Sequence, residues 1–134
     1  MKYWLVKQEP EKYSFDDLIR DKKTVWDGVR NYQARNNLRE MKTGDRVLFY
    51  HSVSDKAVVG VAEVSREAYQ DPTDDTGKWS VVEISALEKF ADPVTLQEIK
   101  DDQKLGEIAL IRQSRLSVVP LKKAEFDRIA KKGK

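Results

Sequence analysis

The sequence predicts a single α+β domain in which a mainly antiparallel sheet is flanked by several short helices. Segments rich in aromatic and β-branched residues recur along the chain between polar turns, which is typical of strands. Short amphipathic stretches that begin with capping residues lie between them and indicate helices. A chain of 134 residues is about the size of one domain with one hydrophobic core.

In the first half of the chain, a strand is expected at residues 2–7, where aromatic and β-branched residues precede Pro10. A short helix is expected at 14–21, because Ser14 is a good N-cap and acidic residues fill the first turn. A second helix is expected at 31–41, and the loop 26–32 leads into it. One face of it is an apolar stripe made by Ala34, Leu38 and Met41.

The second half is expected to hold the rest of the sheet. Strands at 44–52 and 57–65 are joined by only four residues, a spacing typical of a hairpin. A polar loop then leads to a long third strand at about 78–89. The remaining elements are a short helix at 95–102, a weaker apolar segment around 108–111, a last strand at 114–120 and a terminal helix at 121–132.

Composition narrows the classes of function. The absence of cysteine excludes disulfides and the common zinc-thiolate sites. No apolar run approaches the roughly 20 residues that span a bilayer, and the N-terminus has no signal-peptide core. We therefore expect a cytoplasmic protein without a membrane segment, a metal or a cofactor.

Charge is unevenly distributed although the net charge is only +2. Residues 20–46 hold eight Lys and Arg against four acids, and residues 122–134 hold six against two, whereas 67–75 contains four acids and no base. These segments make either a polarised binding surface or ordinary solvated helix faces.

Enzymatic signatures are missing. The sequence has no nucleophile elbow, no metalloprotease motif, no P-loop and no dinucleotide fingerprint. Its single histidine, His51, lies in a strand pattern, where a hydrogen-bonded structural role is more common than a catalytic one. We therefore expect a binding protein rather than an enzyme, with no catalytic residue assigned.

Aromatic residues at loops and strand ends carry the first indication of a ligand. They have polar neighbours, and they are Trp26, Tyr32, Tyr50, Tyr69 and Trp79. Aromatic faces stack on bases at about 1–3 kcal/mol per base, and Asn or Gln amides read base edges. The alternative is that Trp26 and Trp79 are simply core residues.

Several segments, in this order and spacing, closely resemble the EVE domain, a member of the PUA-like superfamily related to YTH and ASCH domains. They are WLVKQEP (4–10), WDGVRNYQARNNLR (26–39), GDRVLFYHS (44–52), VVGVAEV (58–64), AYQDP (68–72) and SRLSV (114–118). The thymocyte nuclear protein family looks similar as well. The resemblance spans about residues 3–121, so 1–134 is expected to be one EVE domain. Gln8 departs from the pattern, since many relatives have Ser there.

The resemblance implies a PUA-like open β-barrel flanked by short helices, with an aromatic and polar pocket for a modified base. Related YTH domains hold a methylated adenine of RNA in an aromatic cage, and EVE proteins are implicated in recognising modified cytosines in DNA. The expected partner is therefore nucleic acid, DNA or RNA, that carries a modified base.

Carried over position by position, the resemblance makes Trp26 a stacking wall. It makes Asn31 either a contact with the ligand edge or a residue that shapes its loop. Tyr69 or Trp79 supplies a second wall. The base-binding set is completed by Tyr32, Tyr50, His51, Ser52, Ser114 and Arg115. The residues expected to contact phosphate are Arg30, Arg35 and Arg39.

Two other functions remain open at this level. One is a pocket for a small ligand or free nucleoside that never meets nucleic acid. The other is an ASCH-like amidohydrolase acting on a modified nucleoside, with Lys7 and Glu63 as the pair that shares the pocket.

Overall fold

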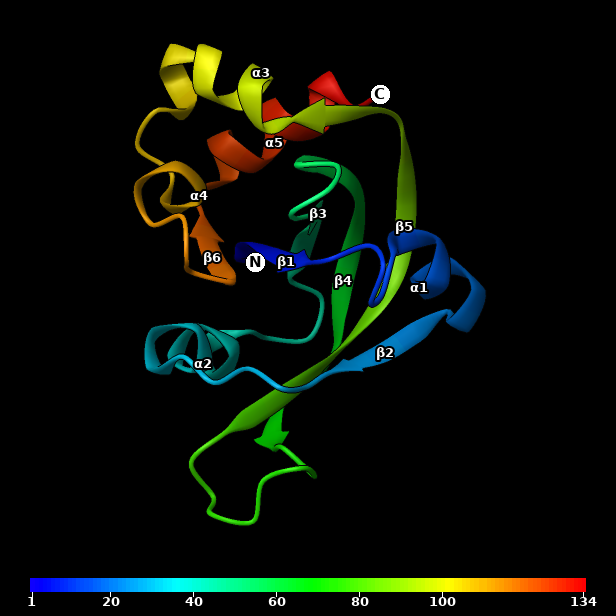
Figure 1. Cartoon of the computed structure of the whole chain (residues 1–134), viewed down its shortest axis with the longest axis vertical. Helices are drawn as coiled ribbons and strands as arrows, with labels where there is room; N and C mark the ends of the chain where they lie inside the picture. The colour runs from blue at the N-terminus through cyan, green and yellow to red at the C-terminus, as the bar shows by residue number, and fades with distance from the viewer.

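The computed structural model describes all residues 1–134 and is built on one six-stranded sheet with the strand order β2-β5-β4-β3-β1-β6 (Figure 1). β1 and β3 are parallel, and every other neighbouring pair is antiparallel. The sheet does not close, because β2 and β6 remain at its edges. The strands are β1 (Tyr3–Gln8), β2 (Lys23–Trp26), β3 (Arg46–His51), β4 (Ala57–Gln70), β5 (Ser80–Thr95) and β6 (Val118–Leu121).

Short helices flank this sheet, which confirms the α+β class (Figure 1). Ser14 and Thr95 cap α1 and α3 with complete capping boxes, as their sequence positions predict. The helical elements are α1 (Phe15–Asp21), α2 (Tyr32–Glu40), α3 (Leu96–Asp101), the single 3-10 turn η1 (Gln103–Leu105), α4 (Ala109–Arg112) and α5 (Lys123–Lys132). None of these helices is long and apolar enough to cross a membrane.

The structure departs from the expected elements mainly where strands pair over a long range. The four-residue strand β2 was not expected; it forms because Lys23–Trp26 pairs with β5 along one edge of the sheet. β4 and β5 extend beyond the expected 65 and 89, because they pair with each other as far as Gln70 with Ser80 and Ala57 with Thr95. Such pairing leaves no trace in local hydrophobic periodicity.

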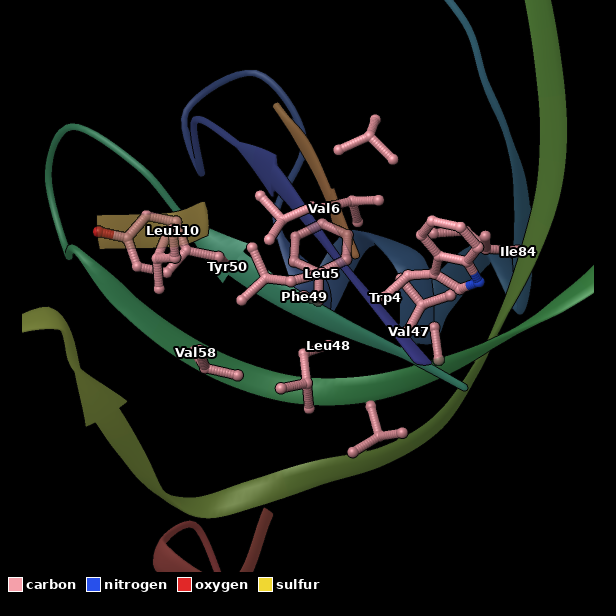
Figure 2. Packing of buried hydrophobic residues seen from close by; sticks show 14 of the residues in the cluster. Trp4, Leu5, Val6, Val47, Leu48, Phe49, Tyr50, Val58, Ile84 and Leu110 are labelled. Carbon is pink, nitrogen blue, oxygen red and sulfur yellow. The ribbon is translucent and has the colours of Figure 1, made fainter. Parts of the chain in front are cut away.

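The core lies where β1 and β3 face the helices, and Figure 2 shows Leu5, Val6 and Phe49 packed together there. Tyr50 and Leu110 belong to the same cluster. Burial of these strands on both faces explains their continuous apolar sequences. Trp26, at the end of β2, belongs to the same cluster and meets Phe49 edge-on, with ring centroids 5.5 Å apart. The sheet therefore positions Trp26 inside the core, next to the segment that leads into α2.

Candidate nucleic-acid interface

The segment between β2 and α2 is held by a carboxylate from the β4–β5 loop, residues 71–79. The side chain of Asp71 is fully buried and accepts hydrogen bonds from the Gly28 N–H at 3.1 Å and from Arg30 Nη1 at 3.1 Å. It also accepts from the backbone and the hydroxyl of Thr73, at 2.8 and 2.6 Å. Burial alone raises the pKa of this carboxyl, but the hydrogen bonds from Thr73, Gly28 and Arg30 outweigh it and lower the pKa to about 2. Asp71 is thus a charged anchor for residues 28–30.

Gly28 fits this anchor because its backbone has a φ of +75°. L-residues with a side chain rarely adopt this conformation, whereas glycine does so without strain. The turn at Gly28 aims its N–H at Asp71 and directs the chain toward the start of α2.

Asn31 caps α2. Its Oδ1 accepts a hydrogen bond from the Ala34 N–H at 2.9 Å, which satisfies one of the free backbone donors of the first turn. The side-chain Nδ2 of Asn31 makes no hydrogen bond within the chain, and the residue is exposed. The cap therefore leaves one amide donor available at the surface.

A cavity of about 320 Å³ opens beside Asn31. Its lining is polar except for Leu116 and consists of Asn31, Gln33, Arg112, Gln113, Ser114, Arg115 and Leu116. The structure thus brings together three residues expected to bind the ligand: Asn31, Ser114 and Arg115. The guanidinium of Arg115 is exposed and makes no hydrogen bond or ion pair within the chain, so a cation is available at the rim.

Lys7 supports the 112–116 side of this cavity. Its Nζ donates a hydrogen bond to the Ser114 carbonyl at 2.8 Å, and partial burial lowers the pKa of its ammonium group. β1 thereby fixes a loop that lies more than 100 residues away in sequence.

On the other side of α2, Tyr32 and Trp79 stack on each other with centroids 4.9 Å apart and an angle of 28° between the ring planes. Figure 1 shows α2 between the β4–β5 loop and the segment that carries α4 and β6, so the helix separates this aromatic stack from the cavity. Tyr32 is 56% exposed and Trp79 is half-buried. Neither ring belongs to the core cluster or to the residues packed against it.

The three arginines expected to contact phosphate all reach the β4–β5 loop or the residue after it. Arg30 binds Asp71 and Thr73, Arg35 donates to the Lys78 carbonyl at 3.0 Å, and Arg39 donates to the Ser80 hydroxyl at 2.9 Å. Because each guanidinium has five N–H donors, these contacts leave donors free in all three. The arginines hold the loop in place and present positive charge at the same surface; phosphate binding stays a prediction.

Four other expected base-binding residues lie outside this cavity. Both ring nitrogens of His51 are engaged: Nε2 accepts from the Phe15 N–H at 3.0 Å, so Nδ1 carries the proton and donates to Asp55 Oδ2 at 2.8 Å. This matches the structural role that its strand position favours. Tyr50 is buried in the core, Ser52 follows β3, and Tyr69 lies under the guanidinium of Arg66 at 3.8 Å.

Trp26 is only 6% exposed and does not line the cavity. Its indole nitrogen makes no hydrogen bond within the chain, yet no buried side-chain nitrogen or oxygen lacks a partner, so this N–H reaches the surface. Trp26 therefore presents a ring edge rather than a face, and a stacking role for it stays a prediction.

The pair suggested for an amidohydrolase is not brought together. Lys7 pairs with Tyr50 of β3, whereas Glu63 pairs with Arg46, four residues earlier on the same strand. That offset is about 13 Å along the strand direction. Glu63 instead binds Arg46 at 3.0 Å, and the two candidate residues do not face one another.

Sequence reasoning missed Asp71 and Gln33. Asp71 begins an Asp-Pro-Thr sequence, which is a recognisable turn signal because Asp and Thr side chains bond to nearby backbone. That signal predicts the contact to Thr73 but not the one to Gly28. Gln33 has no signal beyond its place in the first turn of α2.

Comparison with known proteins agrees with this architecture. Human thymocyte nuclear protein 1 is 35% identical over 93% of this chain and 71% of its own length. The NMR structure of Rpa0253 from Rhodopseudomonas palustris has a TM-score of 0.95 and 42% identity, covering 99% of this chain and 93% of that one. The crystal structure of human THYN1 protein in complex with DNA that contains 5-methylcytosine has a TM-score of 0.92 and 32% identity, covering 100% and 98%.

A more distant structure shares the fold alone: an ASCH protein from Zymomonas mobilis, with a TM-score of 0.60 and 12% identity, covering 98% of both chains. This similarity agrees with the PUA-like fold class expected from the sequence. The vertebrate relatives are named nuclear proteins and so do not support the cytoplasmic location expected above. The model of the EVE domain matches residues 2–132, and the chain belongs to the EVE domain family.

Proposed function

We propose that this protein binds nucleic acid carrying a modified base, without turnover, and that the base enters the cavity beside Asn31. The observation that carries the proposal is the cavity itself. Its lining offers amide, hydroxyl and guanidinium groups from two distant segments, and its volume of about 320 Å³ is at the lower end of the range for small-molecule sites. The 5-methylcytosine DNA bound by the human relative supports this class of ligand.

The lining residues match the chemistry of a base edge. The free Nδ2 of Asn31 is a donor, and Gln33 adds a second amide with both a donor and an acceptor. Paired donors and acceptors of this kind distinguish one base from another. Leu116 is the one apolar surface of the lining, and it suits a methyl group better than an exocyclic polar group.

Entry into such a cavity requires an unpaired base. In duplex DNA the base has to be flipped out of the stack at a cost of a few kcal/mol, which falls for a single strand. The positive charge of Arg115 at the rim, together with the arginines on α2, contributes to binding through the backbone phosphates. The family match over 2–132 supports treating residues 1–134 as one such unit.

The test is a titration panel of DNA and RNA oligonucleotides that differ only in one modified base, with product analysis after prolonged incubation. We expect a preference for a modified base, 5-methylcytosine in DNA first, with the oligonucleotide recovered unchanged. Binding of free nucleosides alone would favour the small-ligand pocket. Time-dependent release of ammonia or an acyl group would favour the amidohydrolase.

Two variants test which cavity binds the oligonucleotide. Arg115→Gln removes a charge at the proposed cavity and should weaken oligonucleotide binding. Lys104→Gln removes a charge at a second polar cavity, between α3 and α5, and should leave binding unchanged. Equal effects of the two variants would show that only overall charge matters.

A further inference from the structure

We propose a second nucleotide site next to the cavity: the stacked rings of Tyr32 and Trp79 bind the base that flanks the modified one in an unpaired strand. This inference rests on the proposed function, because it gives a binding site to the nucleotide that follows the base held beside Asn31. The additional ligand is a second nucleobase with its phosphate.

The first support is that these rings have no structural task in the core. The 31-residue core cluster excludes both, and neither is among the half-buried residues packed against it. Tyr32 keeps 56% of its surface exposed although it stacks on Trp79 at 4.9 Å. An exposed aromatic face at the surface is what successive bases of a single strand stack upon.

The second support is rigidity. The backbone of Trp79 is fixed on both sides: its N–H donates to Asp74 Oδ2 at 3.0 Å, and its carbonyl accepts from the Asp71 N–H at 3.0 Å. Tyr32 is the first residue of α2, directly after the cap. A stack held this way loses little conformational freedom on binding, so more of the stacking energy contributes to affinity.

The third support is charge. The Arg35 guanidinium lies 4.9 Å from the centre of the Tyr32 ring, and that of Arg30 lies 5.5 Å from the Trp79 ring. A base that stacks on Tyr32 brings its phosphate close to these cations, and the attraction between phosphate and guanidinium favours that arrangement. An apolar peptide partner would gain nothing from the same charges.

The fourth support is proximity to the cavity. Asn31 lines the cavity, and Tyr32, the next residue, carries the aromatic stack. The two sites therefore lie on two sides of the start of α2 and are joined by consecutive residues of the chain. In the proposed arrangement the strand passes around the start of α2, with one base in the cavity and the next on the stack.

The experiment compares three DNA ligands: 5-methyldeoxycytidine monophosphate, a short single strand with 5-methylcytosine beside a normal base, and the same strand with an abasic site in place of that neighbour. Wild-type protein should bind the intact strand about 5- to 150-fold more tightly than the abasic strand, the value of one stacked base. Tyr32→Ala should abolish this difference and leave the affinity for the monophosphate unchanged. Tyr32→Phe, which keeps a ring, should restore the difference.

The control is Tyr3→Ala, which removes a ring from another aromatic pair, the half-buried Tyr3 and Phe126, at a centroid distance of 4.8 Å between β1 and α5. Tyr3→Ala should still bind the intact strand more tightly than the abasic strand, as wild-type protein does. Urea unfolding of all variants separates an effect on stacking from an effect on the fold.

Failure of this inference is distinct from failure of the proposed function. The stacking gain should also appear with unmodified strands, because every base has a π-face. Suppose that wild-type protein binds the intact strand more tightly than the abasic strand but shows no preference for the modified base. The assignment of the cavity is then wrong, and the assignment of the stack is supported. An equal loss of affinity for monophosphate and strand in Tyr32→Ala, or no abasic penalty in wild type, overturns the stack.

Discussion

The carboxylate of Asp71 accepts a hydrogen bond from the backbone N–H of Gly28 at 3.1 Å, across 43 residues of sequence. The same oxygen accepts from Arg30, so one buried charge ties the β4–β5 loop to the segment that enters α2. Asn31 follows this segment directly. The geometry of the cavity therefore depends on a residue that does not line it.

Replacing Asp71 with Asn tests this dependence. Asn has one acceptor oxygen and no charge, so the contacts to Gly28, Arg30 and Thr73 are no longer all satisfied. We expect the free energy of unfolding to fall by about 1.5–3 kcal/mol, the usual value of hydrogen bonds to a charged group. Binding of the modified monophosphate should weaken as well, measured by titration at a temperature where the variant is folded.

The control for this variant is Asp74→Asn. Asp74 holds only its own loop, through Thr76 and the Trp79 N–H. Asp74→Asn should reduce the increase in affinity that a flanking base provides and leave the affinity for the monophosphate unchanged. If both variants impair the two ligands alike, Asp71 has no special link to the cavity.

Stability should depend on pH through Asp71. Its folded pKa of about 2 lies below the ordinary value of 3.8, so the folded state favours the carboxylate. The stabilisation is fully present above about pH 4 and is lost as the pH falls through 2. The difference in unfolding free energy between wild type and Asp71→Asn should shrink by about 2 kcal/mol between pH 5 and pH 2, by urea unfolding. Asp102 also has a pKa of about 2, but it is present in both proteins and cancels. A difference in unfolding free energy that does not change with pH would contradict the lowered pKa of Asp71.

Two variants of Asn31 should distinguish its role as a helix cap from a direct contact with the ligand. Asn31→Ser keeps a neutral capping oxygen for the Ala34 N–H but removes the amide donor. Stability should change by less than about 0.5 kcal/mol. Binding of the modified base should weaken by about 1–3 kcal/mol, the range for a contact to a base edge. Asn31→Ala removes both functions and should also reduce stability by about 0.5–2 kcal/mol. Unchanged binding in Asn31→Ser would leave Asn31 as a cap alone.

Arg35 and Arg39 should act through phosphates. Changing both to Gln is expected to weaken modified and unmodified oligonucleotides by similar factors. The slope of log affinity against log salt should flatten by up to about 2 units, about 0.7 to 0.9 for each phosphate that the protein no longer neutralises. Arg20→Gln with Lys123→Gln removes equal charge from ion pairs on α1 and α5 and should preserve the slope. A slope unchanged in the Arg35 and Arg39 variant would identify these side chains as loop supports only.

Trp26 requires a conservative change, because truncating a buried Trp to Ala costs about 3–5 kcal/mol by itself. Trp26→Phe keeps a ring against Phe49 and removes the N–H that reaches the surface. Because Trp26 does not line the cavity, we expect the preference for the modified base and the salt slope to be unchanged; a fall in that preference would show that the ring edge borders the bound base. Trp4→Phe is the matched control, since the Trp4 N–H donates to buried Asp45 and should affect stability alone. Equal preference in both variants would make Trp26 a core residue only.

The sequence alone determined the elements whose signals are local. Ser14, Asn31 and Thr95 begin their helices because a side-chain oxygen accepts a hydrogen bond from the backbone N–H three residues ahead. The hairpin of β3 and β4 follows from short spacing. The motif that begins at Trp26 carried the family resemblance, and with it the fold class.

Tertiary structure decided which of these signals meet. Asn31 shares a cavity with Ser114 and Arg115 because β1 lies between β3 and β6, which brings the chain just before β6 beside the start of α2. Trp26 became a core residue because β2 pairs with β5, a pairing with no local signature. Asp71 became an anchor only where its loop folds back onto Gly28. Local propensity acts over a few residues, whereas these contacts depend on the order of strands in the sheet, which chain periodicity does not encode.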